Sequence, residues 1–133
     1  MGKTAFLFAG QGAQLPGMGK ELCEASPAAA AVFAAADSVR AGTSQQCFAG
    51  SQEELNRTIN TQPCVYCVDL AAARALEEAG IHPDAVAGFS LGEVAAMTFA
   101  GGFTDADGFS FVCYRAECMD YAAQRIPSGM VAV

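Results

Sequence analysis

The run Gly88-Phe89-Ser90-Leu91-Gly92 constrains the fold of this chain more than any other feature. A short apolar stretch, 84–87, precedes it, and a helix-like stretch, 91–100, follows it. Gly-x-Ser-x-Gly between a strand and a helix is the pattern of a nucleophile elbow, because the sharp turn leaves no room for side chains two positions from the serine. A chance match in a glycine-rich chain is the alternative, and the flanking strand and helix favour the elbow. The turn would place Ser90 at a helix N-terminus, where the Leu91 N–H would stabilise an oxyanion.

The composition indicates a folded domain with a real core. The 133 residues are 53% hydrophobic and 16% charged, which excludes a disordered chain. The net charge is −7 and the seven cations are scattered, so we expect no nucleic-acid partner. The apolar start, 5–9, is too short for a signal peptide, and no apolar run is long enough to span a bilayer. We therefore expect a cytoplasmic protein without a membrane partner.

Six cysteines suggest neither disulfides nor a metal site. Without a secretory signal, disulfides are not expected. Cys64-x-x-Cys67 and the pair Cys113 and Cys118 have spacings that are compatible with zinc, but both pairs lie in helix-patterned apolar segments without a companion histidine. Free cysteine in such a segment behaves as a small hydrophobic residue. We expect no metal and no cofactor.

The order of predicted elements is typical of an α/β domain with a parallel sheet. Two short apolar runs, 4–9 and 84–89, predict strands, and the first of them reads as buried. Helical spacing and capping residues predict several helices between and after the strands. The expected helices are 17–24, 27–39, 91–100 and 104–125. A short helix is expected to start at 51–54, and a longer one to start at 61–63 and to end at Gly80. The segment 41–51 is expected to be a polar connection. The apolar residues 130–133 predict the start of another strand, and we expect a truncation there.

The glycine spacing in the loop after the first strand, 10–14, does not match a nucleotide-binding motif. Position 15 is Leu15 where a dinucleotide fingerprint needs glycine, and Met18 stands where a P-loop needs lysine. Two interpretations remain: an ordinary turn between a strand and a helix, or a backbone nest whose N–H groups face the serine. In the second interpretation Gln11 supplies a second oxyanion donor through its backbone N–H.

Arg115 lies in the middle of the last predicted helix, next to apolar side chains at helical spacing such as Phe111 and Val112. A cation on such a face is costly unless it is paired. It would either extend to solvent or form an internal ion pair with Glu93 or Glu117, or it would wait there for a substrate carboxylate. The residues alone leave these two readings open.

A serine nucleophile needs a general base, usually histidine. The chain has one histidine, His82, in the loop before the strand whose far end carries Ser90. Crossing that strand takes roughly 20 Å at about 3.3 Å per residue. His82 is therefore expected at the wrong end of the strand, exposed in its loop.

Four motifs together resemble the malonyl-CoA:acyl carrier protein transacylases and, more broadly, the acyltransferase domains of fatty acid and polyketide synthases. They occur in the order of that family and cover the whole chain. The motifs are Phe8-Ala9-Gly10-Gln11-Gly12-Ala13-Gln14, Asn60-Thr61-Gln62-Pro63, Gly88-Phe89-Ser90-Leu91-Gly92-Glu93 and Arg115-Ala116-Glu117-Cys118-Met119.

The resemblance implies an α/β-hydrolase-like large subdomain and a role for each candidate residue. Ser90 would accept a malonyl group from malonyl-CoA and pass it to the phosphopantetheine thiol of acyl carrier protein, for fatty acid biosynthesis. The backbone N–H groups of Gln11 and Leu91 would form the oxyanion hole. Arg115 would hold the malonyl carboxylate in a bidentate pair. Leu91 after the serine resembles malonyl-selective members.

The chain departs from the family pattern in two ways. Phe89 stands where the family usually has histidine, which changes the wall of the acyl pocket. The catalytic histidine and a later glutamine of the family lie in sequence that this chain lacks. We therefore expect residues 1–127 to be a partial large subdomain, and 128–133 to begin a ferredoxin-like small subdomain. Such a chain would turn over poorly by itself and would need a missing C-terminal half or self-association.

Two other functions are compatible with these motifs. One is a serine esterase of the α/β-hydrolase type, in which Arg115 would have no use because the acyl group is neutral. The other is a non-catalytic module that binds acyl carrier protein. Because carrier proteins are acidic and this chain carries a net charge of −7, local basic residues would have to make that contact.

Overall fold

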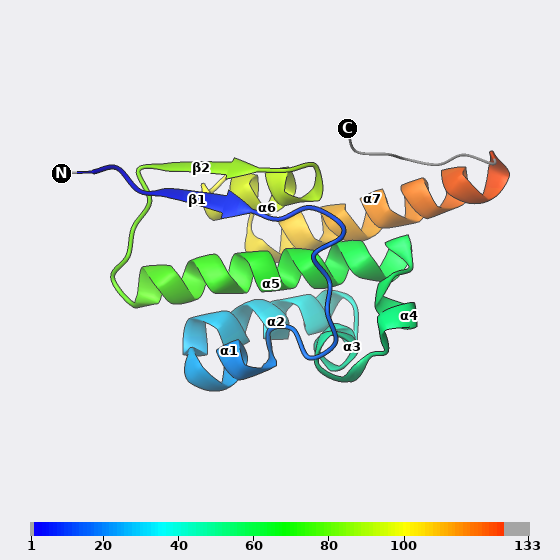
Figure 1. Cartoon of the computed structure of the whole chain (residues 1–133), viewed down its shortest axis with the longest axis horizontal. Helices are drawn as coiled ribbons and strands as arrows, with labels where there is room; N and C mark the ends of the chain where they lie inside the picture. Colours follow the sequence, from blue (N-terminus) through cyan, green and yellow to red (C-terminus); the bar gives the residue numbers. More distant parts are fainter. Residues whose placement is uncertain (1, 127–133) are drawn as a thin grey trace.

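The computed structural model of this chain describes residues 2–126, which form a mixed α/β arrangement with a parallel strand pair (Figure 1). Strands β1 (Ala5–Phe8) and β2 (Ala85–Gly88) lie in register, with Ala5 opposite Ala85 and Phe8 opposite Gly88. The helices are α1 (Lys20–Ala25), α2 (Pro27–Val39), α3 (Thr43–Ala49), α4 (Gln52–Leu55), α5 (Thr58–Glu78), α6 (Leu91–Phe99) and α7 (Asp105–Arg125). The predicted fold class is confirmed, whereas the strand predicted at 130–133 lies outside the described residues.

Helix α5 runs through the middle of the molecule and organises the core. In Figure 1 the two strands and α6 lie on one side of it, and α1 and α2 lie on the other. α5 packs against α2, α6 and α7. Its buried side chains are mostly apolar or small, and Tyr66, Leu70 and Cys67 are at most 1% exposed. A helix buried on several sides holds its neighbours in fixed positions, so residues on α5 are suited to support a site.

Strand β1 is buried on one face only. Phe6 and Phe8 point inward and contact Phe99 of α6, with ring centroids 5.6 and 5.9 Å apart. Leu7 points to the other face and is 80% exposed. The prediction of a buried strand was therefore wrong for alternate residues, because within residues 2–126 the helices cover a single face of the strand pair and side chains alternate between faces.

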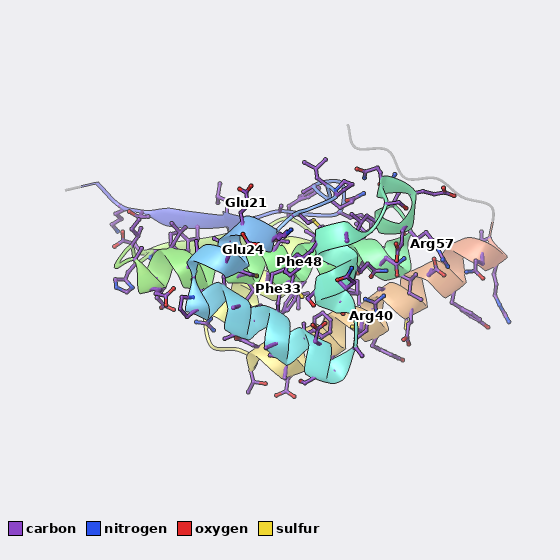
Figure 2. The ribbon with its side chains drawn as sticks, turned by 90° about the horizontal axis from the view of Figure 1, so that it is seen from below. Glu21, Glu24, Phe33, Arg40, Phe48 and Arg57 are labelled. Atoms are coloured by element: carbon purple, nitrogen blue, oxygen red, sulfur yellow. The ribbon has the colours of Figure 1, made fainter. Side chains whose placement is uncertain are left out.

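The polar stretch 41–51, predicted as a connection, contains helix α3. Gly42 adopts φ +84°, a left-handed conformation that turns the chain into the helix. Thr43 and Cys47, four residues apart on the inner face of this helix, are both fully buried. Phe48 then packs on Phe33 of α2, with ring centroids 5.0 Å apart (Figure 2). Too few apolar residues mark this helix in the sequence, and its inner face is recognisable only once α2 and α5 are in place.

Helix α5 begins at Thr58, three residues before the predicted start, so Pro63 lies inside the helix. Proline cannot donate to the carbonyl of residue i−4, which normally weakens a helix. The first turn has other support, because the Thr61 hydroxyl donates to the Arg57 carbonyl at 3.0 Å. A proline one turn after the helix start is therefore tolerated here. Because proline usually marks a helix start, the predicted start of α5 lies too late in the sequence.

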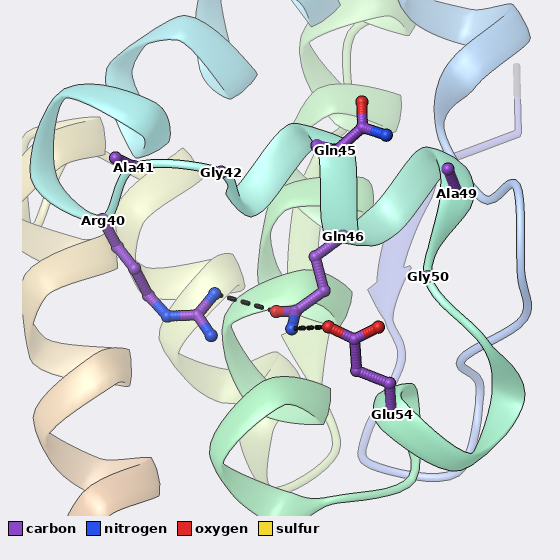
Figure 3. A pocket seen from close by; sticks show the side chains of 8 residues that line it. All are labelled: Arg40, Ala41, Gly42, Gln45, Gln46, Ala49, Gly50 and Glu54. Atoms are coloured by element: carbon purple, nitrogen blue, oxygen red, sulfur yellow. Dashed lines mark hydrogen bonds between the residues drawn. The ribbon is translucent and has the colours of Figure 1, made fainter.

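Arg40, at the C-terminal end of α2, joins three helices through its guanidinium group, and Figure 3 shows its contact with Gln46 of α3. Nη1 donates to Thr43 Oγ1 at 3.2 Å and to Gln46 Oε1 at 2.9 Å, both on α3. Nη2 donates to Asn60 Oδ1 on α5 at 2.9 Å. The Gln46 amide in turn donates to Glu54 at 2.7 Å, beside an open pocket of about 420 Å³. This network explains why α3 is ordered despite its polar sequence.

Replacing Arg40 with methionine is expected to lower the free energy of unfolding by about 1–3 kcal/mol, because the substitution leaves the Asn60 and Gln46 acceptors without their charged donor. Urea unfolding followed by circular dichroism measures this. The matched control is Arg57→Met, since Arg57 is exposed and its side chain caps no helix. We expect the control to change stability by no more than about 0.5 kcal/mol. Equal losses in the two variants would contradict the joining role of Arg40.

Candidate active site

Ser90 occupies a strained turn between β2 and α6. Its backbone has φ 53° and ψ −99°, and among residues 2–126 it is the only non-glycine residue with a positive φ. Such a conformation costs of the order of 1–3 kcal/mol and persists only when the surrounding structure enforces it. The residue is exposed and forms the N-cap of α6. The strain predicted from Gly-x-Ser-x-Gly is therefore present at the serine.

The two glycines of the motif allow close contact between backbones. A β-carbon at Gly92 would lie 2.6 Å from the carbonyl oxygen of Ala9 and would also meet the carbonyl of Phe8. A β-carbon at Gly88 would meet the backbone of Gly92 itself. These positions exclude every side chain, because main-chain atoms have no freedom to move aside. The elbow is thereby pressed against the end of β1.

Leu91 is the first residue of α6, and its backbone N–H adjoins the Ser90 hydroxyl in the chain. In the first turn, Gly92 N donates to Phe89 O at 2.9 Å and Glu93 N to Ser90 O at 3.2 Å. The first N–H of a helix has no partner within the helix, and it carries part of the positive end of the helix dipole. The Leu91 side chain is fully buried, so this amide is held in place.

The loop after β1 passes directly against the elbow. A β-carbon at Gly10 would lie 2.9 Å from the Phe89 carbonyl oxygen and 2.6 Å from its ring. The next residue, Gln11, directs its side chain away toward α5, where Nε2 donates to Thr58 Oγ1 at 3.2 Å. Gln14 holds the loop from within, since its Oε1 accepts from the Gly12 N–H at 2.9 Å. The structure thus brings the backbone that carries Gln11 beside the elbow.

Arg115 lies on α7, which packs against α6, and its side chain contacts the serine at the start of α6. Its Nη2 donates to Ser90 Oγ at 3.1 Å, and its Nη1 donates to Gln62 Oε1 at 2.6 Å. Gln62 is fully buried on α5, and its Nε2 lies 3.2 Å from the sulfur of Met119. A buried amide whose two ends are both engaged fixes the direction of the guanidinium. The cation is therefore positioned within hydrogen-bond distance of the candidate nucleophile.

The alternative that Arg115 forms an ion pair with Glu93 or Glu117 is wrong. Among the described residues, the ion pairs are those that Arg74 forms. The helix face around Arg115 is also less buried than expected. Val112 is fully buried, whereas Phe111 is 47% exposed. Arg115 sits at the boundary between core and solvent, which leaves its guanidinium reachable from outside.

The comparison with known families agrees with this geometry. Residues 5–133 match the acyl transferase domain family. The chain belongs to this family. Malonyl CoA-acyl carrier protein transacylase of Bacillus subtilis strain 168 is 42% identical over 134 residues, which cover 100% of this chain and 42% of that relative. The human mitochondrial malonyl-CoA-acyl carrier protein transacylase is 39% identical over 137 residues, covering 98% of this chain and 34% of the relative.

A solved structure has the same fold as this chain. It is described as a type II PKS acyl-carrier protein in complex with its malonyl-transacylase. It superimposes with a TM-score of 0.85 and 33% sequence identity, over 96% of this chain and 41% of that one. The chain thus spans between about a third and about two fifths of the length of these relatives.

Gln62 is the site residue that sequence reasoning missed. It belongs to the motif Asn60-Thr61-Gln62-Pro63, which by itself predicts no role for it. It lies 53 positions before Arg115, and only the packing of α5 on α7 brings the two side chains together. A polar residue with apolar residues after it, as in Gln62 to Val65, was the available signal for a buried hydrogen-bonding group.

His82 lies in the connection between α5 and β2, at the other end of that strand from Ser90, as the order of elements predicts (Figure 1). It lines a shallow pocket together with Glu77 and Pro83. The structure therefore does not bring the single histidine of the sequence to the elbow.

Some of the cysteines are core residues, and others are not. Cys64 and Cys67 are fully buried in α5, and burial raises the pKa of Cys67 well above its ordinary value. Cys118 is exposed on α7. Across residues 2–126, no three histidine, cysteine or acidic side chains gather where a metal could bind, and no helix is long and apolar enough to cross a membrane.

Proposed function

We propose that this chain carries the acyl-accepting part of a malonyl transferase site, in which Ser90 takes a malonyl group from malonyl-CoA and passes it to acyl carrier protein. The observation that carries the proposal is the 3.1 Å hydrogen bond from the Arg115 guanidinium to Ser90 Oγ. The strained serine at a helix N-terminus supports acyl transfer. The named relatives support the malonyl group and the carrier protein as substrates.

The position of Arg115 suits a malonyl group because of that group's length. The malonyl carboxylate lies one methylene beyond the thioester carbonyl, so a partner for it must lie close to the nucleophile. A guanidinium presents a planar fork that binds both oxygens of a carboxylate. Gln62 holds one nitrogen of this fork, and the nitrogen that now donates to Ser90 Oγ would turn to the carboxylate when substrate enters.

The acyl transfer proceeds in two balanced steps. In the first, Ser90 Oγ attacks the thioester carbonyl of malonyl-CoA, an ester bond forms, the carbon–sulfur bond breaks, and the serine proton leaves to the CoA thiol through a base. The backbone N–H groups of Leu91 and Gln11 would stabilise the oxyanion in between. In the second step, the phosphopantetheine thiol of acyl carrier protein attacks the malonyl ester, a carbon–sulfur bond forms, the ester carbon–oxygen bond to Ser90 breaks, and the thiol proton passes through a base to the serine oxygen.

The nearest charged partner of Ser90 in the described residues is a cation, Arg115, which cannot act as a base. His82 lies at the opposite end of β2. We therefore expect these 133 residues to form the malonyl ester slowly, with the residual rate that positioning and the oxyanion hole provide. A cytoplasmic site of action stays a prediction, and one relative is named as mitochondrial.

The proposal is tested by the intact mass of the chain after incubation with malonyl-CoA, next to Ser90→Ala. We expect a malonyl adduct in the wild type that is absent from the variant, because the Ser90 hydroxyl lies at the elbow within hydrogen-bond distance of Arg115. An adduct that persists in Ser90→Ala would move the acylation to another residue. Absence of any adduct in a folded wild type would contradict acyl acceptance by this chain.

Hydrolysis of neutral esters is the second function that the nucleophile elbow supports. The position of Arg115 is evidence against it. A neutral acyl group has no charge to pair with the guanidinium, so Arg115 would contribute no ion pair to its binding. Acyl preference separates the two functions, because an esterase would not distinguish malonyl from acetyl groups through Arg115.

A further inference from the structure

Among residues 2–126, the Arg115 guanidinium donates hydrogen bonds to neutral groups only. Nη1 donates to the amide oxygen of Gln62 at 2.6 Å, and Nη2 donates to the hydroxyl of Ser90 at 3.1 Å. The salt bridges in this part of the chain are those of Arg74, so no carboxylate there neutralises Arg115. Arg115 is half-buried. A partly desolvated cation without a counter-ion is costly, and a bound carboxylate would supply the missing partner.

The amide of Gln62 lies between two side chains of α7. Arg115 and Met119 are four residues apart, about one helical turn, and therefore lie on the same face of that helix. Gln62 of α5 contacts both of them, since its oxygen accepts from Arg115 and its Nε2 donates to Met119 Sδ at 3.2 Å. The Gln62 side chain is fully buried. Both ends of the amide thus depend on these two neighbours for their hydrogen bonds.

The chemistry of the two neighbours permits only one orientation of this amide. If the amide were turned over, its NH₂ group would face a guanidinium, which has donors only. Its oxygen would face a thioether, which donates no hydrogen bond. Both ends of a buried amide would then lack a partner, which is unfavourable. The amide oxygen of Gln62 is therefore directed at Arg115, and it holds one nitrogen of the fork in place.

A carboxylate at the position of Gln62 would change what Arg115 can bind. Glutamate has nearly the shape of glutamine, but its carboxylate would form a charge-assisted pair with the guanidinium and neutralise it. The carboxylate of an incoming acyl group would then meet an occupied cation and a like charge beside it. The amide avoids both effects, because it accepts a hydrogen bond and leaves the positive charge in place.

We propose that Gln62 is a positioning residue that determines the preference of this site for a negatively charged acyl group. Its neutral amide aims the Arg115 guanidinium at the elbow without neutralising it, and Met119 sets the orientation of the amide. Gln62 acts through Arg115 and does not itself touch the reacting atoms. This role rests on the proposed function, since the carboxylate that Arg115 would select is that of the malonyl group next to Ser90.

The variant that tests this role is Gln62→Glu. The rates of adduct formation at Ser90 from malonyl-CoA and from acetyl-CoA, followed by intact mass, give a malonyl-to-acetyl ratio. We expect this ratio to fall by about 10–100-fold, because the added carboxylate occupies the guanidinium and repels the malonyl carboxylate. Gln45→Glu makes the same change of charge at an exposed position of α3, and its ratio should equal that of the wild type. An unchanged ratio in a folded Gln62→Glu protein would overturn the proposal.

A second variant keeps the test informative if a buried acid prevents folding. Gln62→Met has a similar length and no charge, but it cannot accept a hydrogen bond from Arg115 as an amide does. The guanidinium then loses its fixed direction, so malonyl transfer should slow by roughly 3–10-fold while acetyl transfer stays unchanged. Equal changes for the two acyl groups would reduce Gln62 to a packing residue and overturn the proposal.

Binding of free malonate separates this role from the proposed function. We expect malonate to shift the NMR signals of the Arg115 guanidinium in the wild type, and the same concentration to shift them several-fold less in Gln62→Glu. Arg115→Ala assigns these signals. If no adduct forms but malonate distinguishes the two proteins, the proposed function fails and the role of Gln62 stands. If the adduct forms and the two proteins respond alike to malonate, the proposed function stands and the role of Gln62 fails.

Discussion

Arg115→Ala is expected to slow malonyl transfer to Ser90 by about 10²–10³-fold, the largest effect on activity that the structure predicts. The substitution removes a bidentate pair of charge-assisted hydrogen bonds, which together contribute about 3–4 kcal/mol, and about 1.4 kcal/mol corresponds to a factor of ten. Transfer of an acetyl group, which has no carboxylate, should change by less than about threefold. Adduct formation from malonyl-CoA and acetyl-CoA, followed by intact mass, gives both rates.

Two controls make this result specific. Arg115→Lys keeps the charge but loses the planar fork, so malonyl transfer should recover only in part. Arg125→Ala removes a cation from the exposed end of the same helix, where it stacks on Tyr121, and both rates should stay as in the wild type. Equal losses for malonyl and acetyl in Arg115→Ala would mean that Arg115 serves the serine rather than the substrate, and would remove the main support for malonyl specificity.

Gly92→Ala should lower the free energy of unfolding by about 3 kcal/mol or more, the largest effect on stability. Helix propensity alone favours alanine over glycine by about 1 kcal/mol at a helical position. At Gly92, however, the new methyl group would meet the carbonyls of Phe8 and Ala9, and main-chain atoms cannot yield without moving β1. The sign of the measured change therefore decides between propensity and close packing of the elbow. Urea unfolding measures it.

Gly108→Ala is the matched comparison, since Gly108 also lies within a helix, α7. Its β-carbon would meet two side-chain oxygens, those of Thr98 and Tyr66, and these side chains can shift further than a main chain at the cost of their hydrogen bond. We expect a loss of about 1–2 kcal/mol, smaller than at Gly92. A stabilised Gly92→Ala protein, or the reverse order of the two variants, would show that the elbow is not pressed on the end of β1 as described.

Local patterns in the sequence were reliable where one segment contained the whole signal. Helix α2 has the predicted bounds, with Pro27 in the first turn, because serine and proline at a helix start act within a few residues. Helix α7 likewise begins after its predicted cap, Thr104. The helix α3 was missed because its stabilising contacts, including those of Arg40, come from α2 and α5 rather than from its own residues.

In the candidate site, too, some features follow from one segment of the sequence and others depend on the packing of distant segments. The Gly-x-Ser-x-Gly motif by itself predicted a strained serine at a helix start, because a turn with glycines on both sides permits few other geometries. Which partner Arg115 takes was open in the sequence, because its position on the helix is compatible with pairing and with solvent. Only the packing of α7 on α5 placed it between Gln62 and Ser90.

The sequence by itself therefore determined the class of fold, the order of most elements and the turn at Ser90, since these follow from interactions between residues close in the chain. Only the packing of the helices and strands sets the contacts of Arg115 with Gln62 and of Gly92 with the end of β1. The physical reason is that each joins segments tens of residues apart, whose distance depends on how the surrounding helices pack and leaves no periodic trace in either segment.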